Sequence, residues 1–283
     1  MTRLASVISF CTHDLRFLDK CIKGVQPLSN QIIIPICDHF YNGKAEDLEL
    51  LQKIYRKYPE IDFIEFAYSS EEVYGTPARL IEGTPGWSQH WHNTARLVAS
   101  YFVRPEIEYV LFLDVDEIFA RNFSNHEYEA IRFATYWYFK DARSCASVTP
   151  DGPLLIKREC LSTELLLDPD ERMGYFERVA GKKVREFCID GKPIVHHYSW
   201  VRTKEEMLSK VRSWGHHWER DWETLMQQEG DFVRKYAYRE TPLFWDPLEE
   251  RVSLPEVGGA APNVVKVNAK MIFRMEIEEK IRS

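Results

Sequence analysis

Residues 108–119 decide the fold: they read EYVLFLDVDEIF, an apolar run that stops on three carboxylates, Asp114, Asp116 and Glu117. A short run of apolar and β-branched residues is typical of a strand that is buried on both faces of a parallel sheet. Ligand sites in open α/β sheets lie just beyond the carboxyl ends of the strands. The three acids therefore stand where this class of fold usually carries out its chemistry.

Asp114 and Asp116 are separated by one residue, and close carboxylates raise each other's pKa unless a cation offsets their charge. A hard divalent cation would do so. Mg²⁺ and Mn²⁺ prefer oxygen ligands and often take only one or two carboxylates, while phosphate and water oxygens fill the other positions. The pair therefore predicts a divalent-metal site. The alternative is that the acids only begin a solvated loop.

Strand and helix patterns alternate on the N-terminal side of the acidic strand. We expect helices at 15–25, 46–58 and 88–103, and strands at 4–11, 31–37 and 61–67. This alternation predicts a parallel, doubly wound sheet with right-handed crossovers.

The sequence on the C-terminal side of the acidic strand has a different pattern. Segments 131–140, 154–158 and 192–199 look like strands without intervening helices, and 203–228 reads as the longest helix, opened by a capping box. The predicted fold class is α/β, a Rossmann-type mixed sheet with a parallel nucleotide-binding N-terminal half and a mixed C-terminal half. We place this domain at residues 1–240 and an extension that packs on it at 241–283.

The overall composition limits the function classes. The chain of 283 residues can bury a sizeable core, and its net charge of −7 gives no basic field for nucleic acid. Its six cysteines are scattered without a Cys-x-x-Cys pair and are expected to be reduced. The N-terminus lacks the apolar core of a signal peptide, and no apolar run has the length of a membrane span. We expect a cytoplasmic protein; peripheral contact with a membrane stays open.

Three features together resemble the glycosyltransferases of the GT-A fold, especially the family 2-like group. They are the nucleotide-binding βαβ half at the N-terminus, the helical segment HNTARLVASYF at 92–102, and VLFLDVDEIF at 110–119. The resemblance covers roughly residues 4–220. This chain departs from the family in the helix: residues 93–96 read NTAR, whereas the family has an ARN-type order there. It implies a GT-A-like fold that moves a sugar from a nucleoside-diphosphate sugar to a hydroxyl of a glycan, lipid or small-molecule acceptor.

The same resemblance implies roles at the acidic strand end. Asp116 would be the principal ligand of a Mn²⁺ or Mg²⁺ ion that bridges the diphosphate, and Asp114 would contribute through a water or through the ribose hydroxyls. Many such enzymes add a histidine from a late strand. Here His196 and His197 are candidates that face opposite ways on a strand, and we prefer His197.

Donor-side residues follow the first two strands. Asp38 matches the position where family members recognise the base or ribose, although a strand-end Asp is also a common turn residue. Thr12 and Asp14 should border the nucleotide, unless Asp14 is only a helix cap. Arg96 follows His92 by one helical turn and could approach the phosphates, or it could form a surface or interdomain ion pair.

An inverting enzyme of this kind needs a carboxylate as general base beside the acceptor hydroxyl. The segment LLLDPDERMGYF at 165–176 supplies Asp170 and Glu171 at about the right chain position, although it departs from the family's pattern. Either residue is a candidate. The alternative is an exposed turn that the Asp-Pro pair opens.

Three other interpretations stay open. A haloacid-dehalogenase-like phosphatase also uses an acidic strand end, but normally on the first strand and with Thr or Val where this chain has Ile118. A sugar-nucleotidyltransferase carries a Gly-rich, basic loop after its first strand, whereas residues 10–17 read FCTHDLRF. In a non-enzymatic binding module the acids would only structure a loop.

Overall fold

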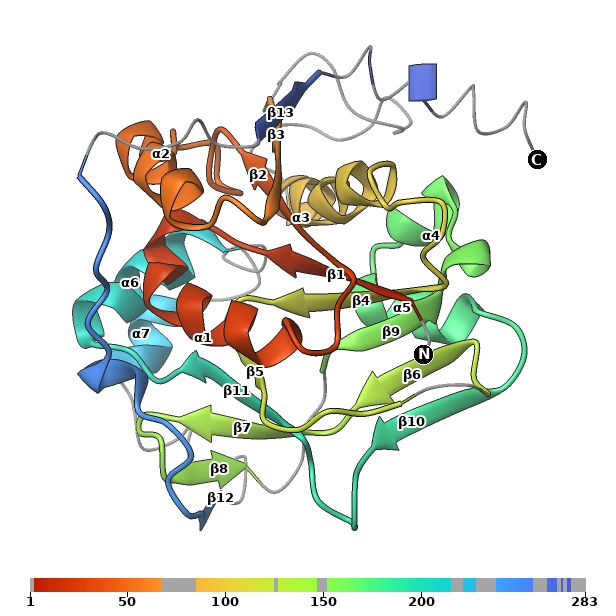
Figure 1. Ribbon diagram of the computed structural model, residues 1–283. Helices are drawn as coiled ribbons and strands as arrows, with labels where there is room; N and C mark the ends of the chain where they lie inside the picture. Colours follow the sequence, from red (N-terminus) through yellow and green to blue (C-terminus); the bar gives the residue numbers. More distant parts are fainter. Residues whose placement is uncertain are drawn as a thin grey trace.

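Two β-sheets carry the fold of this computed structural model, which describes residues 3–67, 85–124, 127–146, 152–214, 221–227, 238–256, 264–268, 271, 274 and 275 (Figure 1). Within these residues the larger sheet has eight strands, in the spatial order β10 (Lys183–Phe187), β6 (Ala130–Phe133), β9 (Leu154–Lys157), β4 (Tyr109–Asp114), β1 (Leu4–Ser9), β2 (Gln31–Cys37), β3 (Asp62–Phe66) and β13 (Val264–Val267).

The N-terminal half of the larger sheet is parallel. Strand β1 pairs in parallel with both β2 and β4, and β2 pairs in parallel with β3. Helices α1 (Leu15–Val25) and α2 (Leu48–Lys57) pack into one core cluster, and α3 (Pro85–Ser100) packs into another. Because helices cover both faces of the sheet, every residue of β1 and β2 is buried.

The C-terminal half is mixed. Strand β9 runs antiparallel to β4 and β6, and a second, five-stranded sheet lies beside the first. The order of this second sheet is β12 (Tyr238–Glu240), β8 (Ser144–Ala146), β7 (Thr135–Phe139), β11 (Val195–Trp200) and β5 (Glu117–Phe119). The predicted α/β class, with a parallel first half and a mixed second half, is therefore confirmed.

Residues 131–140 are not one strand, contrary to the prediction. Strand β6 ends at Phe133 in the larger sheet and β7 begins at Thr135 in the second. Between them, the backbone N–H of Ala134 donates to the carbonyl of Phe187 at 3.2 Å. The chain thus changes sheets within an unbroken β-forming run.

The helix predicted at 203–228 was wrong as a single element. The predicted capping box of Thr203 and Glu206 opens α6 (Lys204–Ser213), but Trp214 leaves helical geometry with ψ 171° and its ring packs against other tryptophans. Helix α7 (Trp222–Gln227) follows, and residues 215–220, with the His216-His217 pair, lie outside the described part.

Two helices were not predicted: α4 (Thr163–Leu166) and α5 (Glu171–Arg178). The C-terminal segment joins the main fold, since β13 pairs in parallel with β3. The boundary at residue 240 stays a prediction. All six cysteines are free thiols, in line with the reduced state expected.

None of the described helices combines the length and the apolar character that crossing a bilayer requires.

Candidate active site

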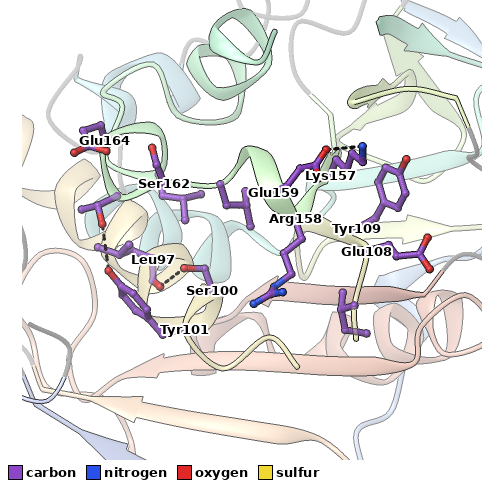
Figure 2. A pocket seen from close by; sticks show the side chains of 14 residues that line it. Leu97, Ser100, Tyr101, Glu108, Tyr109, Lys157, Arg158, Glu159, Ser162 and Glu164 are labelled. Atoms are coloured by element: carbon purple, nitrogen blue, oxygen red, sulfur yellow. Dashed lines mark hydrogen bonds and ion pairs between the residues drawn. The ribbon is translucent and has the colours of Figure 1, made fainter. Parts of the chain in front are cut away.

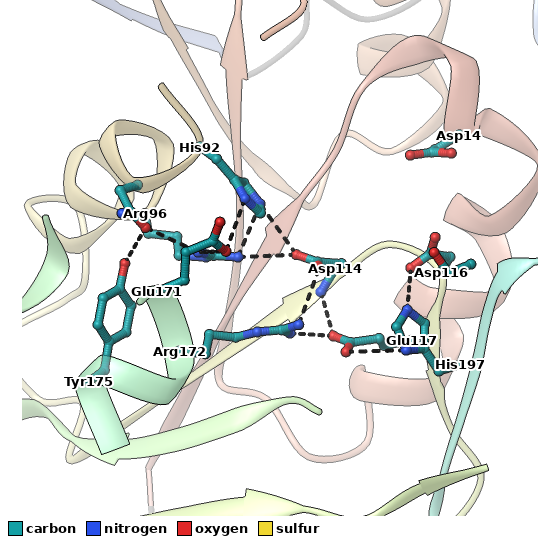
Figure 3. A network of polar contacts seen from close by, with 12 residues as sticks. Asp14, His92, Arg96, Asp114, Asp116, Glu117, Glu171, Arg172, Tyr175 and His197 are labelled. Atoms are coloured by element: carbon teal, nitrogen blue, oxygen red, sulfur yellow. Dashed lines mark hydrogen bonds and ion pairs between the residues drawn. The ribbon is translucent and has the colours of Figure 1, made fainter. Parts of the chain in front are cut away.

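A pocket of about 170 Å³ opens at the carboxyl ends of β1 and β4. These ends coincide because Ser9 and Asp114 are register partners, so the loops after both strands begin at one level. Segments far apart in the sequence meet there, and the charged side chains among them form the network of Figure 3. The lining residues are Ser9, Phe10, Cys11, His13, Asp14, Tyr41, His92, Asp114, Val115, Asp116, Glu171, Arg172, His197, Ser199, Lys210 and Trp214.

Asp116 is buried and surrounded by cations. Its Oδ2 accepts hydrogen bonds from Lys210 Nζ at 2.7 Å and from Arg202 Nη2 at 3.0 Å, and its Oδ1 lies 3.3 Å from His197 Nε2. Burial opposes ionisation, but Lys210, His197 and Arg202 together hold the pKa of the Asp116 carboxyl well below its usual range. Asp116 is thus an anion whose partners are all supplied by the β11–α6 region.

Asp114 points away from Asp116, toward α3 and α5 (Figure 3). Its Oδ2 lies 3.2 Å from Arg172 Nη2, and its Oδ1 lies 3.4 Å from Arg96 Nη2. Burial opposes ionisation of Asp114, but Arg172, His92 and Arg96 hold the pKa of its carboxyl well below the usual range. The two aspartates therefore serve two separate groups of cations.

Glu117 holds the turn between the two aspartates. Its Oε2 accepts from the backbone N–H of Asp114 at 2.7 Å and from Arg172 Nη1 at 2.5 Å, and the residue is completely buried. Burial raises the pKa of the Glu117 carboxyl, although Arg172 opposes the shift. This side chain fixes the directions in which Asp114 and Asp116 point.

Arg96 is a buried ion-pair partner. Its Nη1 lies 2.9 Å from Glu171 Oε2, and only 1% of its side chain is exposed. His92, one turn earlier on α3, also contacts Glu171, at 3.2 Å from Nδ1 to Oε2, and it lines the pocket. Arg96 therefore forms a buried ion pair and not the surface or interdomain pair that the sequence suggested as an alternative, and its approach to the phosphates stays a prediction.

The two candidate bases differ in position. Glu171 is buried and lines the pocket, with a φ of 49° that non-glycine residues seldom adopt. Asp170 is exposed, and the described pocket lining does not include it. Helix α5 can pack closely against Asp168 because residue 174 is a glycine: a Cβ at this position would lie 2.1 Å from Asp168 Oδ1. The structure brings only Glu171 to the pocket.

The residues predicted to lie on the donor side do not all line the pocket. Asp14 lines the pocket and pairs with Arg202, and its side chain makes no helix-capping hydrogen bond. The backbone N–H of Thr12 donates to Glu46 Oε1 at 3.1 Å, and the side chain of Thr12 is also bonded to Glu46. Asp38 is half-buried beside His39, and its Oδ1 lies 2.8 Å from His39 Nδ1. Neither Thr12 nor Asp38 belongs to the described lining of the pocket.

His196 and His197 face opposite sides of β11, as strand alternation requires. His197 lines the pocket beside Asp116, whereas His196 Nδ1 shares a hydrogen bond of 2.8 Å with the hydroxyl of Tyr138 on the other side. Burial opposes protonation of His197, but Asp116 and Glu117 raise its pKa. Of the two neighbouring histidines of β11, His197 is thus the one that lies in the site.

Three cations of the site were missed: Arg172, Arg202 and Lys210. Each is at most 8% exposed. The capping box located α6, which carries Lys210, but no local pattern marks a basic residue as the buried partner of an acid far away in the sequence. These cations are found only in the folded chain, where α5, α6 and the residues just before α6 approach the turn at residues 114–117, here called the acidic turn.

The three predicted metal ligands, Asp114, Asp116 and His197, do not fit a divalent cation as they are arranged. Both oxygens of Asp116 already have partners, and Oδ2 has two cations. Asp114 is turned to a different set of cations. In the described part of the chain, no group of three or more His, Cys, Asp or Glu side chains is arranged to hold a metal ion.

A larger cavity of about 580 Å³ lies at the opposite, amino end of β4, between α3 and α4 (Figure 2). Its ionic groups are engaged locally: Lys157 pairs with Glu159 at 2.5 Å, and Arg158 Nη1 donates to the carbonyl of Pro105 at 3.2 Å. We take the smaller pocket as the candidate site, because it gathers the buried, mutually paired acids and bases.

Several solved structures are similar to this chain. No protein-family model matches it, and no curated protein matches it in sequence. It is similar to a 4-diphosphocytidyl-2C-methyl-D-erythritol synthase from Anaerococcus prevotii, with 12% identity, 74% of this chain and 95% of that chain covered, and a TM-score of 0.37. It is also similar to the glycosyltransferase GlyE of Streptococcus pneumoniae, with 15% identity, 85% of this chain and 66% of that chain covered, and a TM-score of 0.36.

A third similar structure is a Drosophila β1,4-galactosyltransferase 7 in complex with manganese, UDP-Gal and xylobiose, with 11% identity, 73% of this chain and 79% of that chain covered, and a TM-score of 0.34. At these identities and TM-scores, the likenesses carry no argument about the reaction. The activity has to follow from the pocket.

Proposed function

We propose that this chain is a glycosyltransferase, which moves a sugar from a nucleoside-diphosphate sugar to an acceptor hydroxyl. The observation that carries the proposal is the joint presence of Lys210, Arg172 and Glu171 in one pocket at the carboxyl ends of β1 and β4. Sugar transfer needs both cations for a diphosphate leaving group and a carboxylate for the acceptor proton. This pocket supplies both.

In the proposed reaction, the bond from the anomeric carbon to the diphosphate oxygen breaks while the acceptor oxygen bonds to that carbon. Negative charge develops on the departing diphosphate, and Lys210 and Arg172 stabilise it. Glu171 takes the acceptor proton, since Arg96 and His92 hold its carboxylate at the pocket. The products are a glycoside, a nucleoside diphosphate and protonated Glu171, which returns its proton to solvent.

No step of this mechanism passes through a metal. The sequence-based prediction of Mn²⁺ or Mg²⁺ belongs to the same proposal, but two of the ligands proposed for it, Asp114 and Asp116, are already paired with cations of the chain. The nucleotide role of Asp38, the acceptor class and the cytoplasmic location likewise stay predictions.

A phosphatase of the haloacid-dehalogenase type has less support. Its nucleophile is an aspartate that must present a carboxylate oxygen to the phosphorus atom. In this structure both aspartates of the acidic turn contact cations through both oxygens. A sugar-nucleotidyltransferase also has less support, because the loop after β1 of this chain lacks the Gly-rich, basic composition that this class of enzyme carries there.

The proposal is tested by thermal unfolding with UDP, GDP, dTDP and CMP, each added alone and with Mn²⁺. A nucleotide that binds only the native state raises the free energy of unfolding by RT ln(1 + [L]/Kd), and the unfolding temperature rises with it. The nucleotide that stabilises the protein then selects the donor sugars for a hydrolysis assay. If no nucleotide of the panel shifts the transition under either condition, the proposed function is contradicted.

A further inference from the structure

We infer that Lys210 takes the place at Asp116 that a divalent metal would occupy, so that the nucleoside diphosphate binds to the cations of the chain itself. This inference rests on the proposed function and specifies how the same pocket recognises its donor.

The first support is that both oxygens of Asp116 already contact basic side chains of the chain, and that Oδ2 contacts two of them. Lys210 Nζ and Arg202 Nη2 lie 2.7 and 3.0 Å from Oδ2, and His197 Nε2 lies 3.3 Å from Oδ1. A metal ion that bound Asp116 through Oδ2 would have to displace Lys210 or Arg202. The displaced charge would then remain buried without its counter-ion, which is costly.

The second support is that both cations on Oδ2 are anchored. Lys210 Nζ also donates to Ser199 Oγ at 3.0 Å, and Arg202 Nε donates to the carbonyl of Ser199 at 3.0 Å. The guanidinium of Arg202 pairs with Asp14 as well, and it lies over the ring of Phe17, 4.6 Å from the centroid. Neither cation is a surface side chain that could swing away, so these contacts are part of the folded core.

The third support is the orientation of the Lys210 ammonium. It lines the pocket and has three N–H donors, of which Asp116 and Ser199 use two. Within the described residues the third donor is left for a ligand oxygen. An ammonium that is fixed by an aspartate and a serine and directed into the pocket provides a preorganised contact for a phosphate oxygen.

The decisive measurement is calorimetric titration of the wild-type protein with UDP, GDP, dTDP and CMP, in EDTA and in Mn²⁺. We expect the tightest nucleotide to keep its affinity in EDTA within about threefold. Binding that occurs only with Mn²⁺ would overturn the inference and leave the proposed function standing. The absence of binding under both conditions would contradict the proposed function, and the inference with it.

The variant Lys210→Met tests the residue itself. We expect it to lose at least about tenfold in nucleotide affinity in EDTA, and to gain Mn²⁺ binding, measured by electron paramagnetic resonance, because Asp116 and His197 lose a competing cation. The matched control is Lys204→Met, an exposed lysine of the same helix, which should change neither quantity.

Lys210→Arg separates charge from folding. It keeps a cation in the pocket and should recover part of the affinity that Lys210→Met loses. Circular dichroism of each variant reports whether it folds. If Lys210→Met is folded and binds the nucleotide in EDTA as the wild type does, Lys210 is not the phosphate ligand and the inference fails. If it does not fold, the wild-type comparison in EDTA and Mn²⁺ still decides.

Discussion

Arg172 Nη1 lies 2.5 Å from Glu117 Oε2, and both side chains are buried although 55 residues separate them in the sequence. The same guanidinium contacts Asp114, so a single cation ties α5 to the turn that carries the acids. Because Glu117 also accepts from the backbone of that turn, the pair controls the geometry of the whole site.

Replacing this cation should therefore destabilise the fold. Arg172→Met leaves Glu117 buried without its counter-ion, and we expect a loss of about 3–5 kcal/mol in the free energy of unfolding, measured by urea denaturation. Arg185→Met on β10 is the control, since that side chain is 51% exposed, and it should change the value by no more than about 0.5 kcal/mol. Equal effects of the two substitutions would contradict the role given to Arg172.

The acidic turn offers a second comparison. Asp116→Asn removes the charge that Lys210 and Arg202 share, so we expect a loss of about 3–5 kcal/mol in stability together with loss of transfer activity. Asp38→Asn changes a carboxylate whose side chain is 43% exposed and should leave stability within about 0.5 kcal/mol. A fall in nucleotide affinity in the Asp38 variant would support its predicted contact with the base or ribose, and unchanged affinity would remove it from the site.

The general base can be assigned by a pair of neighbouring substitutions. Glu171→Gln keeps the shape of the side chain but cannot accept the acceptor proton, so kcat should fall by about 10²- to 10⁴-fold. Asp170→Asn alters an exposed side chain outside the described pocket lining and should change kcat less than about twofold. Steady-state transfer kinetics measure both. A larger loss in the Asp170 variant would reverse the assignment.

The sequence predicted the parts of the fold that depend on local pattern. Strands such as β2, at Gln31–Cys37, are continuous apolar runs, and the helices between them show regular apolar spacing. The switch of sheets at Ala134 could not be predicted, because residues on both sides of it favour β structure equally and only tertiary pairing separates them. Helix α5 was missed because the Asp168-Pro169 pair reads locally as a turn.

The site was predictable only on its acidic side. Asp114 and Asp116 follow directly from a buried strand, and alternation on β11 restricted the choice between His196 and His197. Their cations come from elements that meet the turn only in the folded chain; Lys210 lies 94 residues from Asp116 in the sequence. Long-range pairing of buried charges has no local signature, so the sequence shows the acids of the site without the cations that contact them.

His196, on the far side of β11 from the pocket, gives a prediction about pH. Burial, with a smaller contribution from Lys20, lowers the pKa of its imidazole to about 4. The unfolded chain binds a proton near pH 6.5, so between about pH 6.5 and 4 the unfolded state holds more protons than the native state. Acidification through this window therefore destabilises the native protein.

The variant His196→Gln isolates this contribution. From the two pKa values, His196 should lower the free energy of unfolding of the wild type by about 2 kcal/mol between pH 8 and pH 5. This decrease should be absent in the variant. Urea denaturation at the two pH values measures it. The pKa of His90 is also lowered to about 4, so His90→Gln should show a similar saving at a separate site. Equal pH dependence in the wild type and His196→Gln would show that His196 is not held neutral by burial.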